Sequence, residues 1–120
     1  MNEIKGEYET KGNTRISIYN KYSMRIACSL GSLLSVNQVL DCSQILSKTA
    51  VETIWIPETW GMENFSMLSM VSQKALKPQI GSSIINVFSR SPASIAMGAV
   101  TVDTISNGRL ILGLGTSSAI

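Results

Sequence analysis

After residue 24, short apolar runs alternate along the chain with stretches whose apolar residues follow a helical period. The apolar runs begin near residues 25, 53, 79 and 109, about 26 to 30 residues apart. They predict strands over residues 25–31, 53–57, 80–85 and 110–114. Strands and helices that alternate in units this short predict right-handed crossovers and a parallel sheet.

Three helices are expected between these strands. Ser35 is the predicted cap of the first, whose apolar positions at the 3.6-residue period are Val36, Val39, Leu40, Leu46 and Ala50. The second covers residues 64–74, with Phe65, Leu68 and Val71 on one face. The third begins at Ser91-Pro92 and stops at Asn107-Gly108. Its predicted apolar face holds Ala93, Ala96, Met97 and Val100, and the methionines predicted to fill the core are Met62, Met67, Met70 and Met97.

The fold class follows from the repeated unit. A doubly wound sheet and a (β/α)₈ TIM barrel both contain such units, and the similar lengths of the four units favour the barrel. A complete barrel needs about 250 residues. We therefore expect an α/β fold, the amino-terminal half (about four βα units) of a (β/α)₈ barrel with parallel strands, over residues 24–120. Residues 1–23 are expected to be a flexible or peripheral extension with a short strand near residues 15–19.

Composition narrows the classes of partner. The chain is 44% hydrophobic and 15% charged, as in globular proteins, and its net charge is +2 without a basic cluster. Nucleic acid is therefore not an expected partner. No run approaches the roughly 18 apolar residues that span a membrane. We expect a cytoplasmic protein with no nucleic-acid and no membrane partner.

The chain contains no histidine. This excludes from it histidine metal sites and Ser-His or Cys-His nucleophile pairs, and no metal site is expected. Cys28 and Cys42 lie in a predicted strand and a predicted helix. Reduced, packed thiols are the favoured interpretation, and a disulfide between them is the less favoured alternative.

Polar side chains follow the predicted strands at their carboxyl ends, which meet at one face of a parallel sheet. Glu58 and Trp60 follow the second strand, and Asn86 and Arg90 follow the third. A polar rim above an apolar core is typical of a ligand site. Each residue also has a simpler interpretation: Glu58 as a solvated carboxylate, Trp60 as a surface-packed indole, Asn86 as a turn residue, and Arg90 as the partner of a neighbouring carboxylate.

Two further patterns occur near the end of the chain. Residues 113–117 (GLGTS) are similar to a phosphate loop, because glycine lets backbone N–H groups approach an anion. They lack the Walker lysine and the third glycine of the dinucleotide fingerprint, and a crowded strand end explains them equally well. Asp103 and Arg109 flank the Asn107-Gly108 turn and predict a local ion pair.

The last third of the chain carries a more specific order of residues. The sequence contains Arg90-Ser91-Pro92-Ala93, then Thr101-x-Asp103 with Ser106, Gly108 and Arg109, then Leu112-Gly113-Leu114-Gly115. This order resembles the luciferase-like monooxygenase superfamily, specifically its deazaflavin-dependent oxidoreductases. The segments TIWIPETWG and IGSSIINVFSRSP resemble the same proteins, so that the resemblance runs from residue 24 to residue 120. The pattern is most similar to that of the 5,10-methylenetetrahydromethanopterin reductases.

The resemblance implies a function. Such proteins pass hydride between reduced 8-hydroxy-5-deazaflavin (coenzyme F420) and a methylene group on a pterin-type small-molecule substrate. The resemblance further implies a non-prolyl cis peptide after the third strand, here Ser83-Ile84, in a bulge that backs the deazaflavin ring. It also implies Glu58 as the catalytic residue, which orients the substrate or transfers a proton. The residues that it implies for cofactor binding are Ser29, Trp60, Ser83, Ile84 and Asn86.

The chain departs from the family pattern at three places. Ser29 stands where an acidic residue is expected, Glu58-Thr59 stands for an acid-histidine pair, and Asn86-Val87 stands for Asn-Pro. We expect this chain alone to be inactive and the full-length protein to be a homo-oligomer. The alternatives are a flavin-dependent luciferase-like monooxygenase that uses FMN, and an inactive truncated half-barrel.

Overall fold

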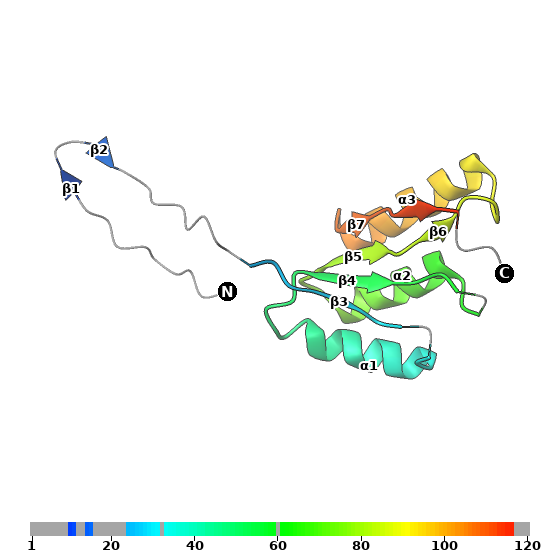
Figure 1. Ribbon diagram of the computed structural model, residues 1–120, viewed down its shortest axis with the longest axis horizontal. Helices are drawn as coiled ribbons and strands as arrows, with labels where there is room; N and C mark the ends of the chain where they lie inside the picture. The colour runs from blue at the N-terminus through cyan, green and yellow to red at the C-terminus, as the bar shows by residue number, and fades with distance from the viewer. Residues whose placement is uncertain (1–9, 12–13, 16–23, 32, 60, 117–120) are drawn as a thin grey trace.

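The computed structural model describes residues 10–11, 14–15, 24–31, 33–59 and 61–116 (Figure 1). Near the amino terminus, β1 (Thr10–Lys11) and β2 (Thr14–Arg15) pair antiparallel. The strand expected near residues 15–19 coincides with β2 only at Arg15, and residues 16–19 lie outside the described part of the chain. The elements that follow are β3 (Ala27–Ser29), α1 (Val36–Leu46), β4 (Thr53–Ile56), α2 (Asn64–Lys74), β5 (Gln79–Ser82), β6 (Ile85–Asn86), α3 (Pro92–Ser106), β7 (Leu110–Ile111) and β8 (Leu114–Gly115).

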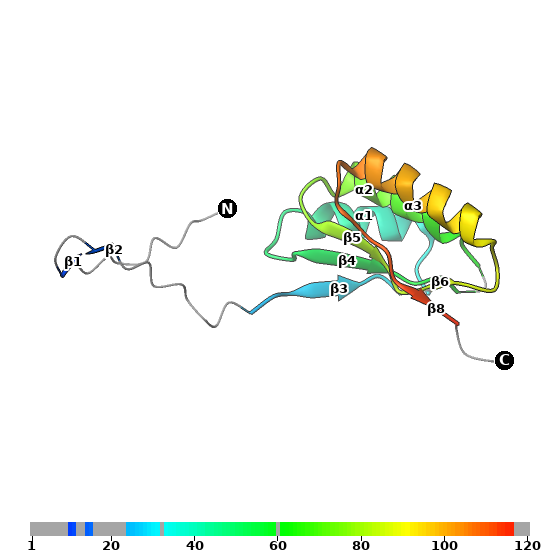
Figure 2. The same cartoon turned by 90° about the horizontal axis from the view of Figure 1, so that it is seen from above.

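The main sheet has four parallel strands in the order β3-β4-β5-β7. Spatial order therefore follows chain order, without the reversal that marks the switch point of a doubly wound sheet. Figure 2 shows α1, α2 and α3 together on one face of this sheet. One-sided cover of sequentially ordered parallel strands is the arrangement of a barrel wall, as the sequence predicts.

The predicted helix caps are present. Ser35 accepts a hydrogen bond from the backbone N–H of Gln38, and the Gln38 side chain accepts one from the Ser35 N–H, which completes a capping box. Ser91 caps α3, and Asn107 ends it in the left-handed conformation at φ 59°. The first helix is shorter than predicted. It ends at Leu46, whose carbonyl accepts the Thr49 hydroxyl, so Ala50 lies in a turn.

The core lies between the sheet and the helices. Its buried members are Leu30, Val39, Ile54, Ile56, Met67, Leu68, Val71, Ala75, Ile80 and Val102. The predicted burial of Met67 is confirmed, and Met62 is half-buried against the core. The prediction was wrong for Met70, which is 45% exposed.

The predicted inner face of α3 was also wrong. Met97 and Val100 are 72% and 66% exposed, whereas Ile95 and Val102 are buried. This helix carries apolar residues around most of its circumference, so their period alone could not select the face that packs on α2. The Phe65 ring decides the face, because it fills the space that a Cβ of Gly98 would occupy, 2.6 Å from that position.

The third and fourth predicted strands are each interrupted. The third is split into β5 and β6 around the Ser83-Ile84 peptide bond, which is cis as the resemblance implies. The fourth is split into β7 and β8, and β6 pairs with β8 in parallel. At the double break, the Ser82 hydroxyl donates to the Gly113 carbonyl and accepts from the Gly113 N–H, both at 2.9 Å. This hydroxyl replaces the missing ladder bonds.

The predicted ion pair between Asp103 and Arg109 is absent among the described contacts. Arg109 instead donates to the carbonyls of Ser72 and Ala75 at the end of α2, and Asp103 accepts from the backbone N–H of Leu110. The last carbonyls of a helix have no intrahelical partner, and an arginine that donates several N–H groups can satisfy more than one of them. Burial lowers the pKa of Arg109 from its ordinary value.

Both cysteines are free thiols, as expected. Over the residues described, the longest helix is α3, and none has the length and hydropathy required to cross a bilayer.

Candidate functional site

The carboxyl ends of the strands place the predicted site residues along one edge of the sheet. The register aligns Ser29 of β3 with Trp55 of β4, and Trp55 with Gly81 of β5. Ser83 follows β5 directly, and its N–H donates to the Ile56 carbonyl at 2.9 Å. Ser29 is therefore two strands away from the Ser83-Ile84 segment, on the same sheet. Trp60, the remaining predicted cofactor residue, lies outside the described residues.

Glu58, the predicted catalytic residue, is held by four hydrogen bonds. Two come from the Arg90 guanidinium, at 2.5 Å to Oε1 and 2.8 Å to Oε2. Two come from backbone N–H groups, Asn86 at 3.0 Å and Asn64 at 3.4 Å. The carboxylate thus joins the loop after β4 to the start of α2, to strand β6 and to the loop before α3.

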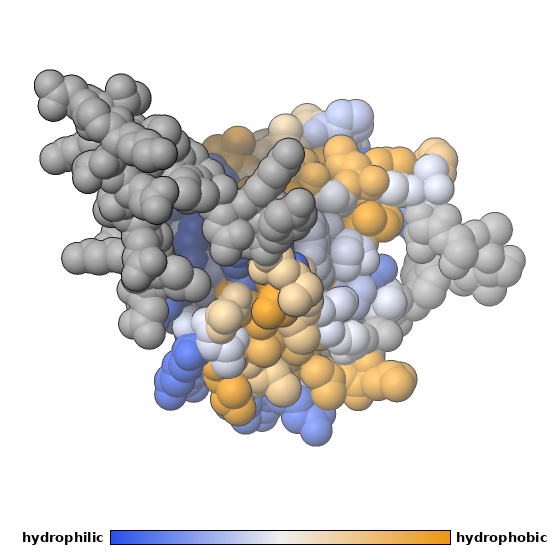
Figure 3. All heavy atoms as spheres, turned by 60° about the vertical axis from the view of Figure 1, so that its left-hand side comes forward, coloured by the Kyte–Doolittle hydropathy of each residue, from blue (hydrophilic) through white to orange (hydrophobic). Residues whose placement is uncertain are grey.

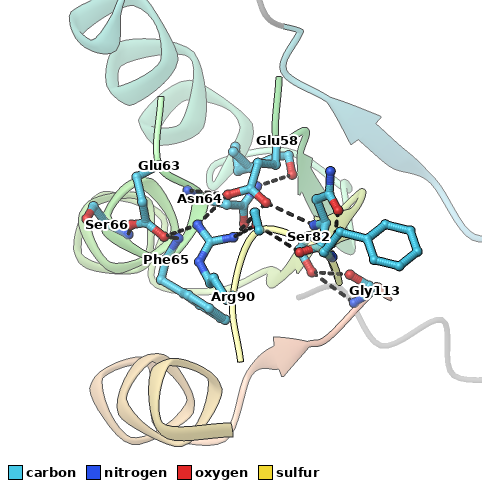
Figure 4. Close-up of polar contacts among 12 residues, drawn as sticks. Glu58, Glu63, Asn64, Phe65, Ser66, Ser82, Arg90 and Gly113 are labelled. Carbon is cyan, nitrogen blue, oxygen red and sulfur yellow. Dashed lines mark hydrogen bonds and ion pairs between the residues drawn. The ribbon is translucent and has the colours of Figure 1, made fainter. Parts of the chain in front are cut away.

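Arg90 lies between two carboxylates (Figure 4). Beyond Glu58 it binds Glu63 at 2.6 Å, and its guanidinium lies 5.4 Å from the centre of the Phe65 ring. The side chains of Arg90 and Glu58 are only 16% and 12% exposed. The predicted ion-pair role of Arg90 is therefore observed, and the interpretation of Glu58 as a solvated loop carboxylate is wrong.

These contacts decide the protonation of Glu58. Burial alone raises the pKa of this carboxyl group, but the hydrogen bond from Arg90, the Asn86 N–H, the Arg90 charge and the Asn64 N–H together lower the pKa below its ordinary value. Glu58 is accordingly ionised at neutral pH. With both oxygens occupied, it accepts hydrogen bonds and is poorly placed to donate a proton.

Glu63 was not identified from the sequence. It is the N-cap of α2, where its carboxylate accepts from the N–H groups of Phe65 at 3.1 Å and Ser66 at 2.7 Å. Burial raises its pKa, but the contacts to Ser66, Phe65 and Arg90 lower the pKa overall. An acidic residue immediately before a predicted helix start is the signal that identifies such a cap.

Beside this cluster, two polar groups remain uncommitted. The Ser83 side chain is exposed, and among the described residues no hydrogen bond engages its hydroxyl. Asn86 uses its Oδ1 to accept from the Phe88 N–H at 2.8 Å, which leaves its Nδ2 without a partner in the described part of the chain. Ile84 packs over Gly115, where an added Cβ would lie 3.1 Å from the Ile84 Cδ1.

The chemical character of these groups, one apolar and two polar, matches that of a deazaflavin or flavin ring. Such a ring offers an apolar face together with carbonyl and N–H groups at its pyrimidine edge. The Ser83-Ile84 segment carries the exposed Ser83 hydroxyl, the free amide donor of Asn86 lies shortly after it, and the Ile84 side chain packs against Gly115. The residues that the structure brings together are thus Glu58, Ser83, Ile84 and Asn86.

The phosphate-loop interpretation of residues 113–117 is not supported where the structure describes them. Leu114–Gly115 forms strand β8 and pairs with β6. Gly113 packs against Ser82, since an added Cβ would lie 2.1 Å from the Ser82 carbonyl oxygen. The glycine at 113 is therefore required by close approach of two backbones. A separate groove of about 790 Å³ lies between α2 and α3 and reaches Arg90 and Glu63.

Comparison with known proteins places this geometry in a family. The family model for luciferase-like monooxygenases matches residues 20–119. A Mycobacterium tuberculosis protein described as a coenzyme F420-dependent oxidoreductase is 36% identical over 66 residues, which cover 55% of this chain and 19% of that protein. The 5,10-methylenetetrahydromethanopterin reductase of Archaeoglobus fulgidus is 31% identical over 67 residues, 55% of this chain and 20% of the reductase.

Solved structures share the fold at low sequence identity. The coenzyme F420 dependent tetrahydromethanopterin reductase of Methanopyrus kandleri superposes with a TM-score of 0.74 at 21% identity, covering 81% of this chain and 28% of that one. The oxygenating constituent of 3,6-diketocamphane monooxygenase from Pseudomonas putida, in complex with FMN, gives 0.72 at 11% identity and covers 81% and 30% of the two chains. The expected fold, the amino-terminal half of a (β/α)₈ barrel, is confirmed.

The chain spans only about a fifth to a quarter of the length of the curated relatives it matches. The match nevertheless covers the described sheet, its three helices and the Ser83-Ile84 segment. On this basis the chain belongs to the luciferase-like monooxygenase family.

Proposed function

We propose that this chain supplies the amino-terminal part of the cofactor and substrate site of a coenzyme F420-dependent oxidoreductase. The proposed reaction passes hydride between the reduced deazaflavin and a methylene-tetrahydromethanopterin-like substrate. The observation that carries the proposal is the break between β5 and β6, where Ser83 and Asn86 present uncommitted polar groups at the carboxyl edge of a parallel sheet. Two curated relatives whose descriptions name this coenzyme support the choice of cofactor.

The deazaflavin, when bound, supplies the hydride chemistry. The residues of this chain are proposed to bind the deazaflavin ring and to orient it. Ser83 and Asn86 provide hydrogen-bond donors, Ile84 provides an apolar contact, and Ser29 contributes a hydroxyl from the neighbouring part of the sheet edge. Trp60 stays a predicted wall of the same site.

A titration tests the proposal. The whole chain is mixed with reduced coenzyme F420 and, in parallel, with FMN, and the absorbance and fluorescence of each cofactor are followed. Saturable binding of the deazaflavin with weaker or no binding of FMN supports the proposal. Absence of binding by both cofactors contradicts it and favours a non-catalytic half-barrel.

FMN is the second candidate cofactor. The solved monooxygenase that is in complex with FMN superposes on 81% of this chain, with a TM-score close to that of the reductase. Preferential retention of FMN in the same titration would assign the chain to the flavin-dependent branch of the family.

The proposal extends to the cellular location, the substrate and the oligomeric state. We infer a cytoplasmic protein, which the two free thiols support, with a pterin-type small molecule as substrate. The longer protein is proposed to be a homo-oligomer.

A further inference from the structure

Two carboxylates share the Arg90 guanidinium, but only one of them also contacts strand β6. Glu58 binds Arg90 and accepts the N–H of Asn86, whereas Glu63 binds Arg90 and accepts N–H groups of α2 alone. The contact with strand β6 is therefore a difference between the two carboxylates that an experiment can separate. Figure 4 shows the arginine between them.

The contacts connect helix α2 to the short strand β6 through three side chains. Helix α2 has eleven residues, and the carboxylate of Glu63 is fixed at its amino terminus by two backbone N–H groups. Arg90 connects Glu63 to Glu58, and the Phe65 ring lies against the guanidinium. Strand β6 has only two residues, so it has few ladder bonds of its own. Ladder bonds from the N–H groups of Ile85 and Val87 hold one side of this segment, and the bond from the Asn86 N–H to Glu58 holds the other.

We propose that Glu58 and Arg90 are positioning residues: Arg90 orients the Glu58 carboxylate, and Glu58 fixes the backbone of Asn86 so that Ser83 and Asn86 face a bound ring. This inference rests on the proposed function for the ring, while the link between Glu58 and β6 rests on contacts within the chain alone. It replaces the proton-transfer role expected for Glu58. A carboxylate that accepts four hydrogen bonds at 12% exposure acts by orientation.

Hydrogen exchange tests the link without any cofactor. In Glu58→Gln, the negative charge is lost and one side-chain oxygen becomes an NH₂ group, so the remaining oxygen cannot accept all four hydrogen bonds that Arg90, Asn86 and Asn64 donate to Glu58. We expect the exchange rate of the Asn86 amide, followed by NMR, to rise about tenfold or more. The reason is that weakening a hydrogen bond to a charged acceptor can shift the equilibrium between the bonded and the open amide by more than tenfold. The Phe88 amide, which donates to the Asn86 Oδ1, is a second reporter.

Glu63→Gln is the matched control. It removes the same charge from the same guanidinium but leaves the contact between Glu58 and Asn86 in place. The Asn86 amide should then exchange within about threefold of the wild-type rate, and the amides of Phe65 and Ser66 should exchange faster. Equal acceleration at Asn86 in both variants would show that loss of charge, and not the specific contact, disturbs β6. Unchanged exchange at Asn86 in Glu58→Gln overturns the proposal.

The arginine is tested by a conservative replacement. Lysine keeps the charge of Arg90 but loses the planar fork that binds Glu58 at two atoms. Arg90→Lys should therefore show Asn86 exchange intermediate between those of wild type and Arg90→Gln. Far-UV circular dichroism and the exchange of the Leu30 amide, which donates to Trp55 away from the cluster, exclude global unfolding as the cause.

Cofactor titration completes the test and separates the two proposals. If the wild-type chain binds reduced deazaflavin, Glu58→Gln should weaken binding about tenfold or more and shift the absorbance of the bound ring, and Glu63→Gln should change affinity by less than about threefold. Full affinity in Glu58→Gln would contradict the positioning role. If the wild-type chain binds no deazaflavin, the proposed function fails, and the exchange data still decide whether Glu58 and Arg90 hold β6.

Discussion

Arg109 is a single side chain that holds three segments together. Its guanidinium donates to the carbonyls of Ser72, Ala75 and Pro78, and its Nε donates to the Ser106 carbonyl at 2.7 Å. It thereby satisfies the carboxyl end of α2 from the first residues after α3. Arg109 therefore caps the carboxyl end of α2, although it lies more than thirty residues later in the chain.

Arg109→Met should destabilise the fold by about 2 to 4 kcal/mol, because several half-buried carbonyls lose a charged donor at once. Urea unfolding followed by circular dichroism measures the change. Arg25→Met is the matched control, since Arg25 forms an exposed ion pair with Glu52 and its loss should cost less than about 1 kcal/mol. Equal losses for the two variants would contradict this account of Arg109.

The carboxylates around Arg90 predict a pH dependence. The pKa values of Glu58 and Glu63 are lower in the folded chain than the ordinary value of 4.5. A depressed folded-state pKa contributes stability that is present above the unfolded pKa and is lost as pH falls through the folded value. We therefore expect the free energy of unfolding to decrease as the pH falls below 4.5.

The double variant Glu58→Gln, Glu63→Gln should flatten this acid dependence, although its stability at neutral pH is lower. Urea titrations between pH 3 and 6 measure both quantities. An acid dependence as steep as that of the wild type would show that other carboxylates, and not this cluster, control acid stability.

At the scale of elements, the interruptions in two strands shape the sheet edge around the Ser83-Ile84 segment. The interruptions in the third and fourth strands lie side by side, and the Ser82 hydroxyl bridges them through both backbone groups of Gly113. The pairing of β6 with β8 continues the sheet beyond the break. The Ser83-Ile84 segment is thus held between two short parallel ladders.

Gly113→Ala should destabilise the chain by about 2 kcal/mol or more, since the new Cβ would lie 2.1 Å from the Ser82 carbonyl oxygen and the backbone must move. Gly31→Ala provides the comparison, because nothing lies within 4 Å of its Cβ position, and its stability should change by less than about 1 kcal/mol. The midpoints of thermal unfolding measure both changes. Tolerance of alanine at 113 would argue against close approach of the two strands.

At the scale of the whole molecule, several large apolar side chains are exposed on the first and last units of the sheet. They include Ile26 beside β3, Met97 and Val100 on α3, and Leu112 and Leu114 around β7 and β8. Figure 3 shows several such apolar areas on one face. Within the described sheet, β3 and β7 are also the end strands, so each presents an unpaired edge.

We expect this chain to self-associate in a concentration-dependent manner, because open parallel edges and apolar flanks favour further strand and helix packing. Sedimentation velocity over a hundredfold range of concentration measures it. Val100→Lys should weaken association, whereas Met70→Lys, at a 45% exposed position on the central helix α2, should have a smaller effect. A single monomeric species at all concentrations would contradict the prediction.

The sequence by itself determined the alternation of strands and helices, the caps at Ser35 and Ser91, the stop at Asn107-Gly108 and the position of the cis bond through family resemblance. Each of these features depends on residues that are close in the sequence or on a sequence motif, so the local sequence is enough to predict it. Only the tertiary structure decided which face of α3 packs, and that Glu58 and Glu63 share Arg90. It likewise decided that Arg109 caps α2 and does not pair with Asp103. Each of these contacts joins residues about 27 to 37 positions apart. Such pairings arise because the sheet brings distant segments together, and no local pattern specifies them.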